Sequence, residues 1–403
     1  MAINSSKLSE ICIIGGGIAG LTAAMWMKQH ELAPLTWLFE ADDKLGGLCK
    51  VGHWQDDKGF GTCEYGEHIF HTEDERIKDI FLALYPDAKV YEHITEIYVE
   101  GPKGKAYVPY PINLDTIDKL YEISGWSETA FNPKEYCSKK ISLANLDPST
   151  TQLCYRYIIE PYSRKQWGHY NFDTVLEDRI RVYLDRDNRT FRDRYQYVPG
   201  KMDYGNVRKS LKGVHIRCKT SMTYRDILND YIYCGSRNTL IINTSPIDAF
   251  YTDNLNKCIL PYRTLKFKGG VDLNDTYKDR PMTINYPDKN RAYTRVHNYG
   301  KDIVFEYPDE CTRGDIPMYP IYEEGFSSET LFRTIQRNTD KQLHLEAHED
   351  GFAQYYTDYI QKDDDDTKVT ILHVGRLGSY KYMNIDTTMY QVVHALDQVV
   401  EVN

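Results

Sequence analysis

Residues 11–20 read Ile-Cys-Ile-Ile-Gly-Gly-Gly-Ile-Ala-Gly, and this stretch decides the fold class. The apolar run at its start is typical of a short buried strand, and three glycines follow it at once. Small and apolar residues continue from Ile18 to Met25, as in a helix that packs closely on a sheet. A second apolar run, Leu35 to Phe39, ends in Glu40. Strand, glycine turn, helix and strand in this order predict the start of a dinucleotide-binding unit.

The glycines of this turn are spaced as G-x-G-x-x-G, at Gly15, Gly17 and Gly20. The first glycine permits a tight turn, the second lets a pyrophosphate approach the backbone, and the third lets the helix pack on the strand. The start of the helix, at Ile18 and Ala19, is then expected to face the phosphates.

The acidic residue at the end of the second strand supports this interpretation. Glu40 lies twenty residues beyond Gly20, where a carboxylate accepts hydrogen bonds from ribose hydroxyls. A glycine triplet alone can be no more than a turn, but the strand, the helix and the acid in register make that reading weak. The sequence therefore predicts that an ADP moiety binds here.

A second glycine pair, Gly46 and Gly47 followed by Leu48, comes soon after Glu40. Such a pair lets the chain pass close to the phosphates of a flavin nucleotide, and the pattern resembles that of flavoproteins with two dinucleotide-binding domains. No second G-x-G-x-x-G occurs in the sequence, so we expect no separate NAD(P)H domain. We predict FAD as the cofactor, which is either reduced by a donor bound elsewhere, such as NAD(P)H, or works without a nicotinamide domain.

Composition narrows the class of protein further. The 403 residues carry 49 Lys and Arg against 59 Asp and Glu, and the net charge of -10 argues against a nucleic-acid partner. No apolar run approaches the roughly 20 residues that cross a bilayer, and residues 1–10 lack the features of a signal peptide. Nine cysteines without paired or zinc-like spacing predict reduced thiols, no metal site and a cytoplasmic protein without membrane contact. The 34 Tyr against 13 Phe are not explained by composition alone.

The chain is predicted to fold as an α/β protein in three parts. A discontinuous Rossmann-like FAD-binding domain carries an inserted helical domain and an antiparallel β-sheet domain. Pro161 is expected to end a helix near Glu160, and the aromatic and basic pattern from Tyr183 to Val198 predicts strands. The predicted ranges are 1–90, 200–255 and 365–403 for the FAD-binding domain, 110–180 for the helical domain, and 91–109, 181–199 and 256–364 for the antiparallel sheet domain.

Eight further sequence blocks follow one another between residues 65 and 382. They are similar to blocks of the UDP-galactopyranose mutases, in the order of that family, and with the glycine motif the resemblance runs from residue 11 to about residue 395. The blocks are 65–72 (YGEHIFHT), 162–168 (YSRKQWG), 191–196 (FRDRYQ), 245–248 (SPID), 292–295 (AYTR), 306–308 (EYP), 314–320 (GDIPMYP) and 375–382 (GRLGSYKY).

The resemblance implies a flavoenzyme that interconverts the pyranose and furanose forms of a nucleotide-diphosphate sugar, such as UDP-galactose and UDP-galactofuranose. In that family reduced FAD attacks the anomeric carbon through N5, the nucleoside diphosphate leaves and later returns, and there is no net redox change. A covalent intermediate divides one difficult substitution into two easier ones. The departing diphosphate must be held nearby, which favours arginines and tyrosine hydroxyls. A homodimer is a further expectation from the family.

The resemblance assigns the diphosphate clamp to Arg179 and Arg295. Arg181 is an alternative to Arg179, because the chain departs there from the Arg-Ile-Pro-Val-Arg of the family. Tyr319 and Tyr382 are matched to tyrosines that donate to the same phosphates. Outside such blocks, an arginine or a tyrosine is more often an ordinary surface or core-edge residue.

Other roles follow from the same blocks. Tyr162 is matched to a tyrosine that stacks on the base, and Trp167 to a tryptophan of the substrate pocket. Arg376 is matched to an arginine whose charge stabilises the reduced flavin. The resemblance also implies catalysis near the flavin by His71, substrate contacts from Ser163, Arg181, Thr190, Glu306 and Asn384, and FAD contacts from His68, Ile69, Ile385, Asp386 and Met389.

Four positions depart from the family pattern. Ile158 stands where an aromatic or large apolar side chain faces the base, and Thr190 where a tyrosine contacts the phosphates. Asn384 replaces an active-site aspartate, and Glu96 an asparagine near sugar and flavin. Because the flavin and diphosphate residues are retained while these have changed, we expect a pyranose mutase whose sugar or base differs from UDP-galactose.

Two other interpretations stay open. A redox flavoenzyme of the amine-oxidase or desaturase type shares the FAD unit, but it requires oxygen or a nicotinamide partner and favours an apolar aromatic cage where this chain has Arg295. A non-catalytic nucleotide-sugar-binding homologue is the second, and Thr190 and Asn384 are the residues that favour it.

Overall fold

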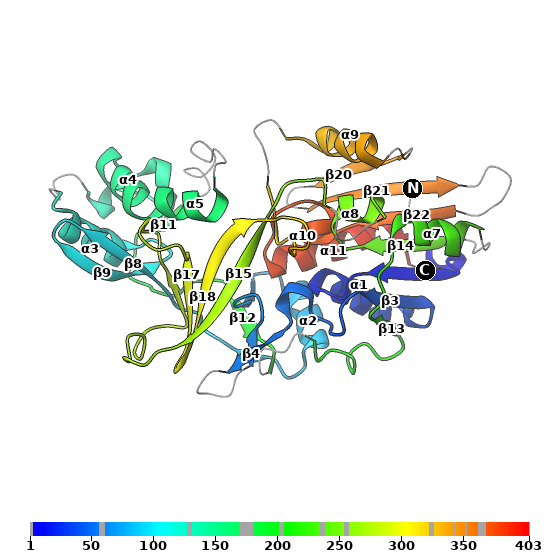
Figure 1. The fold of residues 1–403 in the computed structure, drawn as a ribbon, viewed down its shortest axis with the longest axis horizontal. Coiled ribbons are helices and arrows are strands. Elements are labelled where there is room, and N and C mark those ends of the chain that lie inside the picture. Colours follow the sequence, from blue (N-terminus) through cyan, green and yellow to red (C-terminus); the bar gives the residue numbers. More distant parts are fainter. Residues whose placement is uncertain are drawn as a thin grey trace.

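A computed structural model of the chain shows an elongated molecule with two lobes (Figure 1). The N- and C-terminal segments lie together in one lobe, the helices between about residues 110 and 170 lie in the other, and long strands cross the middle. Arg179 lies outside the described residues. These are 3–55, 61–126, 131–168, 180–200, 205–233, 238–253, 258–321, 326–339, 341, 343–350, 353–361 and 368–402.

A seven-stranded, mostly parallel sheet forms the first lobe, as the glycine motif predicts. Its strands follow the order β13-β3-β2-β14-β22-β21-β20, and β21 is antiparallel to both of its neighbours, β22 and β20. The strands are β13 (His215–Cys218), β3 (Thr36–Glu40), β2 (Glu10–Ile14), β14 (Thr239–Asn243), β22 (Lys368–His373), β21 (Ala353–Gln361) and β20 (Glu346–Asp350).

The central strand β2 is apolar because both of its faces are buried. Ile11 and Ile13 belong to one hydrophobic core, whereas Cys12 and Ile14 belong to a second core on the other face. The first core is covered by α1 (Ile18–Gln29), α2 (Glu75–Leu84) and α11 (Ile385–Val399), and the second by α7 (Tyr224–Ile227), α8 (Ile247–Tyr251) and α9 (Ser328–Thr339).

The antiparallel edge of this sheet differs from the predicted domain ranges. The range 256–364 places β20 and β21 with the antiparallel domain, but β21 pairs with β22 from Tyr356 opposite His373 to Gln361 opposite Lys368. An alternating strand pattern does not say which sheet the strand joins. Strands that follow one another in the chain tend to pair, and that tendency places β21 here.

A second seven-stranded sheet contains the antiparallel strands predicted between Cys258 and Tyr319, in the order β19-β15-β18-β17-β16-β8-β9. Neighbouring strands are antiparallel except β16 beside β8. Strands β15 and β18 cross the middle of the molecule (Figure 1). The strands are β19 (Tyr319–Pro320), β15 (Tyr262–Val271), β18 (Asp302–Glu310), β17 (Arg295–Tyr299), β16 (Thr283–Asn285), β8 (Thr95–Gly101) and β9 (Gly104–Tyr110).

Helices α3 (Leu114–Ser124) and α4 (Pro148–Cys154) pack with β8 and β9 around a third core in the second lobe. Helix α5 (Glu160–Trp167) follows α4. The prediction that Pro161 ends a helix is wrong, because a π-helical turn at Tyr155–Ile159 joins α4 directly to α5. Pro161 then lies in the first turn of α5, where a missing N–H group costs little.

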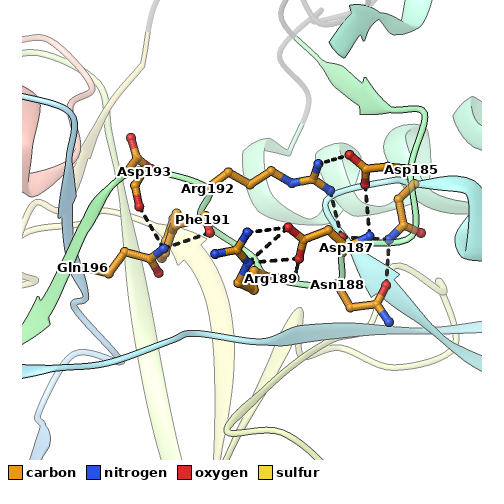
Figure 2. Close-up of polar contacts among 9 residues, drawn as sticks. Asp185, Asp187, Asn188, Arg189, Phe191, Arg192, Asp193 and Gln196 are labelled. Carbon is orange, nitrogen blue, oxygen red and sulfur yellow. Dashed lines mark hydrogen bonds and ion pairs between the residues drawn. The ribbon is translucent and has the colours of Figure 1, made fainter. Parts of the chain in front are cut away.

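Residues 181–198 form two short strands separated by an irregular segment, rather than continuous strands. In that segment Asp185 Oδ1 accepts a hydrogen bond from the Asp187 backbone N–H at 3.0 Å, and Arg192 binds the other oxygen of Asp185 at 2.5 Å (Figure 2). Aspartate side chains that bind nearby backbone favour turns over strands. The flanking strands are β11 (Arg181–Tyr183), which pairs with β10 (Lys140–Ser142), and β12 (Tyr195–Val198), which lies between β6 (Phe70–Thr72) and β7 (Lys89–Val90).

The remaining short elements close the two ends of the chain and flank the first lobe. They are β1 (Ile3–Asn4) paired with β23 (Val400–Glu401), β4 (Val51–Gln55) paired with β5 (Gly61–Cys63), and the short helix α10 (Gly375–Gly378) after β22.

Candidate active site

A cavity of about 390 Å³ opens at the carboxyl ends of β2 and β3 and at the start of α1. Two glycines of the turn beside it have no room for a side chain. A Cβ atom on Gly15, whose φ is +98°, would lie 2.4 Å from Thr244 Oγ1, and one on Gly20 would lie 1.9 Å from the carbonyl oxygen of Gly15. Helix α1 begins after Gly17 without a side-chain cap, so its N-terminus is left for an anion.

Glu40 lines this cavity, as its predicted ribose contact requires. Its two oxygens accept backbone hydrogen bonds from Gly16 and Asp42, each at 2.7 Å. Burial raises the pKa of Glu40 above its ordinary value, and the two backbone donors oppose that rise. The backbone thus holds the carboxylate at the end of β3, beside the glycine turn.

The second glycine pair packs directly on the first. The Gly46 N–H donates to the Gly16 carbonyl oxygen at 2.9 Å, and a Cβ atom on Gly47 would lie 2.9 Å from the Cα atom of Gly17. Leu48 continues the same wall of the cavity. The two glycine motifs therefore form one cradle.

The residues expected to contact the cofactor separate into two groups. Eleven of them line the cavity: Gly15, Gly17, Ile18, Ala19, Glu40, Gly46, Gly47, Leu48, His68, Arg376 and Ile385. Asn384, which is predicted as a substrate contact, also lines the cavity. The other group does not line the cavity: Gly20 and Met389 are buried in the first lobe, Ile69 packs in its core, and Asp386 is partly buried at the start of α11.

Two segments for which the sequence predicts no role also line the cavity. They are residues 220–222 after β13 and residues 244–246 after β14. Ligands of parallel sheets bind beyond the carboxyl ends of the strands, so the positions of these strands carried the signal. The block at 245–248 was noted for its resemblance only.

Arg295 lies at the centre of a polar cluster beyond the cavity, between β17, β18 and α5. Its Nε donates to Asn285 Oδ1 at 3.0 Å, and Nη2 donates to the hydroxyl oxygen of Tyr162 at 3.0 Å. Nη1 lies 3.4 Å from Glu306 Oε2, directly across the strand pair. Burial raises the pKa of Tyr162 to about 12, so that its hydroxyl keeps its proton at neutral pH.

Three aromatic side chains face one another beside this cluster. The ring centre of Trp167 lies 5.9 Å from that of Tyr319 and 6.0 Å from that of Tyr382, both at edge-to-face angles. The Arg376 guanidinium lies 5.1 Å and 5.2 Å from the same two tyrosine rings. Burial raises the pKa of Tyr319, which therefore also stays protonated.

Arg376 connects the two parts of the site. It lines the cavity, and its Nε and Nη2 donate to the carbonyl oxygen of Met383 at 3.0 Å and 2.6 Å. It also contacts the rings of Tyr319 and Tyr382, which lie beside the Arg295 cluster. The structure thus brings together Arg295, Tyr162, Trp167, Tyr319, Tyr382 and Arg376 from the predicted set, next to the dinucleotide cradle.

Other predicted substrate residues lie elsewhere or at the margin. Thr190 donates to Thr95 Oγ1 at 2.9 Å in the irregular segment, and Arg181 is exposed on β11. Ser163 is half-buried on α5, next to Tyr162. His71 lies 3.0 Å from Asp193 Oδ2 and stacks on Phe191 at 3.8 Å, outside the residues that line the cavity.

Two of the departures from the family pattern are also placed by the structure. Ile158 is 4% exposed and packs in the core of the helical lobe. Glu96 lies 3.2 Å from Arg280, in an ion pair on β8.

Behind Arg295 lies a buried charged chain that the sequence analysis did not single out. His297 Nε2 is 3.1 Å from Glu306 Oε2, and Nδ1 is 3.6 Å from Glu67 Oε1. Two features of the sequence point to this chain. Arg295 and His297 are two residues apart on one strand and therefore share a face, and Glu67 directly precedes the cavity residue His68. What was missing was the pairing of β17 with β18 that puts Glu306 on that face.

Within the described ranges, no three or more His, Cys, Asp or Glu side chains gather in a way that could hold a metal ion. None of the helices in the described part of the chain has the length and apolar character needed to cross a bilayer.

Comparison with known families gives two matches. Residues 157–345 match the UDP-galactopyranose mutase family, and residues 13–84 match an NAD(P)-binding Rossmann-like domain. The first match covers the Arg295 cluster and α5, and the second covers the glycine cradle.

Similar proteins agree over nearly the full chain. A dTDP-fucopyranose mutase of Escherichia coli is 24% identical, covering 96% of this chain and 97% of its own. A probable UDP-galactopyranose mutase of Klebsiella pneumoniae is 24% identical over 96% of this chain and 94% of its own. A crystal structure of reduced UDP-galactopyranose mutase shares the fold, with a TM-score of 0.55 at 15% identity, over 97% of this chain and 93% of that one. The predicted resemblance is therefore confirmed: over nearly its full length this chain is similar to proteins named as pyranose mutases, and it shares their fold.

Proposed function

We propose that the protein interconverts the pyranose and furanose forms of a nucleotide-diphosphate sugar, with reduced FAD as cofactor and without net redox change. One observation carries the proposal. A cluster of arginines and protonated tyrosines, suited to a diphosphate, meets the end of a cavity suited to a dinucleotide, and Arg376 belongs to both.

The residues of the cradle fit FAD. In this proposal the glycine turns bring backbone N–H groups to a pyrophosphate, Glu40 binds a ribose, and Arg376 meets the isoalloxazine; Glu40 and Arg376 both line the cavity. When bound and reduced, FAD supplies the nucleophile that exchanges with the nucleoside diphosphate at the anomeric carbon. An external donor such as NAD(P)H is proposed as the reductant.

The chain's own residues bind and hold the leaving group. Arg295 supplies a charge-assisted donor, and the rings of Tyr319 and Tyr382 lie 5.9 Å and 6.0 Å from the ring of Trp167. A diphosphate held there stays close to the anomeric carbon and returns in the reverse step instead of diffusing away. Trp167 and Tyr162 present aromatic surface to the base and sugar.

Few residues bear on which sugar and which base the substrate carries. Both UDP-galactose and a dTDP-linked deoxysugar are candidates, because relatives named for each are equally identical to this chain. Of the departures, Ile158 is in a core and Thr190 bonds to Thr95, so an altered specificity rests on Asn384, which lines the cavity.

The test incubates dithionite-reduced protein with UDP-galactose and with dTDP-fucose, and separates the products by chromatography with mass detection. We expect a product of unchanged mass and shifted retention from at least one of the two sugars, and none from the oxidised protein. A product lighter by two hydrogens, with oxygen uptake, would instead establish the redox flavoenzyme. Binding of both sugars without any product would establish the non-catalytic homologue.

A further inference from the structure

Two carboxylates, Glu67 and Glu306, and the ring of His297 form a buried chain that ends at Arg295. The side chains of Glu67, His297 and Glu306 are 3%, 1% and 2% exposed, respectively. Glu306 Oε2 is shared, since it lies 3.1 Å from His297 Nε2 and 3.4 Å from Arg295 Nη1. Thr283 anchors the other end by donating to Glu67 Oε2 at 2.5 Å.

Strand register keeps these side chains in place. Arg295 is directly opposite Glu306 in the β17–β18 pair, and His297 is directly opposite Thr283 in the β16–β17 pair. Glu67 enters from the segment before β6, immediately before His68, which lines the dinucleotide cavity. The chain therefore extends from the cofactor side of the site to the substrate side.

Both ring nitrogens of His297 face a carboxylate oxygen. A neutral imidazole has one N–H donor and one acceptor, so one of its nitrogens would turn a lone pair toward a carboxylate. Among the described residues, Glu67 Oε1 and His297 Nδ1 have no hydrogen-bond partner, and their 3.6 Å separation is an ionic contact. Only the doubly protonated ring makes both contacts favourable.

Charge balance leads to the same conclusion. With a neutral His297, two buried carboxylates would face one arginine, and an uncompensated buried charge costs several kcal/mol. Burial lowers the pKa of His297, but Glu306 and Glu67 outweigh burial and the net direction is upward. Nearby His68 and His93 are different, because burial lowers the pKa of each to about 4 and leaves both neutral.

We propose that His297, held between Glu67 and Glu306, is a positioning residue that keeps Arg295 available to the substrate diphosphate. A carboxylate bound to Arg295 alone cancels its charge and competes with the diphosphate. His297 takes part of the charge of Glu306, so that the cluster presents a cationic guanidinium instead of a neutral pair. This inference rests on the proposed function, since it assumes that Arg295 meets a nucleoside diphosphate.

The test measures the affinity of the oxidised FAD-bound protein for UDP and for dTDP, without turnover. His297→Gln leaves a buried excess of one negative charge, and we expect at least a tenfold weaker affinity. Adding Glu67→Gln removes that excess, so the double variant should recover most of the loss. His93→Gln is the matched control, because it makes the same change at a buried but neutral histidine, and its affinity should stay within twofold of the wild type.

The outcomes separate the possible explanations. A merely structural role for His297 predicts that the double variant binds no better than His297→Gln, and that result overturns the inference, as does unchanged binding by His297→Gln. Neutron diffraction from wild-type crystals at pH 7.5 gives a check that needs no variant: deuterons on both ring nitrogens support the inference, and one deuteron overturns it. A wild type that binds neither UDP nor dTDP overturns the proposed substrate class and this inference with it.

Discussion

Arg295 shows at the scale of one residue how strand register makes a binding site. Because Arg295 is directly opposite Glu306 in the antiparallel pair of β17 and β18, the two side chains lie on the same face of the sheet. Its remaining donors reach Asn285 on the neighbouring strand and Tyr162 on α5. A single guanidinium thereby connects the sheet to the helical lobe.

Replacing Arg295 should remove most of the activity. We expect Arg295→Ala to lower kcat/KM at least 100-fold, because a charge-assisted contact to the leaving diphosphate is lost and Glu306 is left buried without its arginine. Arg295→Lys keeps the charge but not the fork geometry and should retain part of the activity. Steady-state kinetics of the reduced protein measures both, and equal activity of Arg295→Ala and wild type would contradict the assignment.

Three buried histidines should make the protein less stable in mild acid. Burial lowers the pKa of His68 and His93 to about 4 and that of His373 to about 3. The unfolded chain, with histidine pKa values near 6.5, binds more protons below about pH 6.5, so the free energy of unfolding falls as the pH falls. His297 acts in the opposite sense, since its pKa is raised and its contribution is complete below the unfolded pKa.

The expected loss between pH 7.5 and pH 5.5 is about 1 kcal/mol for each of the three histidines. Urea unfolding of the FAD-bound protein at these two pH values, above the range in which ordinary carboxyl groups titrate, measures it. A midpoint that is the same or higher at pH 5.5 would show that these histidines are not held neutral.

At the scale of elements, the glycine cradle depends on the close approach of α1 to β2. Gly20→Ala places a methyl group 1.9 Å from the Gly15 carbonyl oxygen, so the helix has to move away from the strand. Overpacking of this kind costs about 1–3 kcal/mol, and we expect the purified variant to lose most of its bound flavin. Gly270→Ala on β15 is the control, since its nearest neighbour would be 3.6 Å away. Absorbance at 450 nm relative to protein gives the flavin content, and full occupancy in Gly20→Ala would refute the account of the cradle.

Helix α5 is fastened to the antiparallel sheet at its C-terminal end. Arg263 Nε donates to the Gln166 carbonyl oxygen at 3.1 Å, and Lys165 Nζ donates to the carbonyl oxygens of Tyr286 at 2.5 Å and Asp288 at 2.9 Å. Positive charge at a helix C-terminus is favourable in addition to these hydrogen bonds. The fastening fixes where Tyr162 and Trp167 meet Arg295.

Breaking this fastening should affect substrate binding more than flavin binding. We expect Arg263→Met to lower the free energy of unfolding by about 2–3 kcal/mol and to raise KM several-fold, with flavin content unchanged. Lys266→Met, three residues further along β15 in an exposed ion pair with Asp309, should change stability by less than about 1 kcal/mol. A normal KM in folded Arg263→Met would show that α5 is positioned by other contacts.

At the scale of the whole molecule, the sequence predicts what backbone geometry dictates and loses precision where distant segments meet. The glycine positions follow from close approaches that no side chain permits, so the cradle was predictable from spacing. The edge strand β21 was not, because its sheet depends on pairing with β22. Pro161 misled for a similar reason, since a π-helical turn before it lets the helix continue.

The site shows the same division. Motif blocks located Arg295, Tyr319 and Tyr382, but matching a position does not give the direction of its side chain. Ile158 and Thr190 match positions that face substrate in the family, and here one lies in a core and the other bonds to Thr95. The role proposed for Arg179 stays a prediction, because this residue lies outside the described ranges.

The central claim is that the reaction leaves the substrate at its original oxidation level, and turnovers per reducing equivalent test it most directly. The protein is reduced once under anaerobic conditions, excess reductant is removed, and the sugar nucleotide that it accepts is added. The account predicts many product molecules per flavin, with the flavin spectrum still that of the reduced form at the end. One product molecule for each flavin oxidised, with a mass change of two hydrogens, would contradict it.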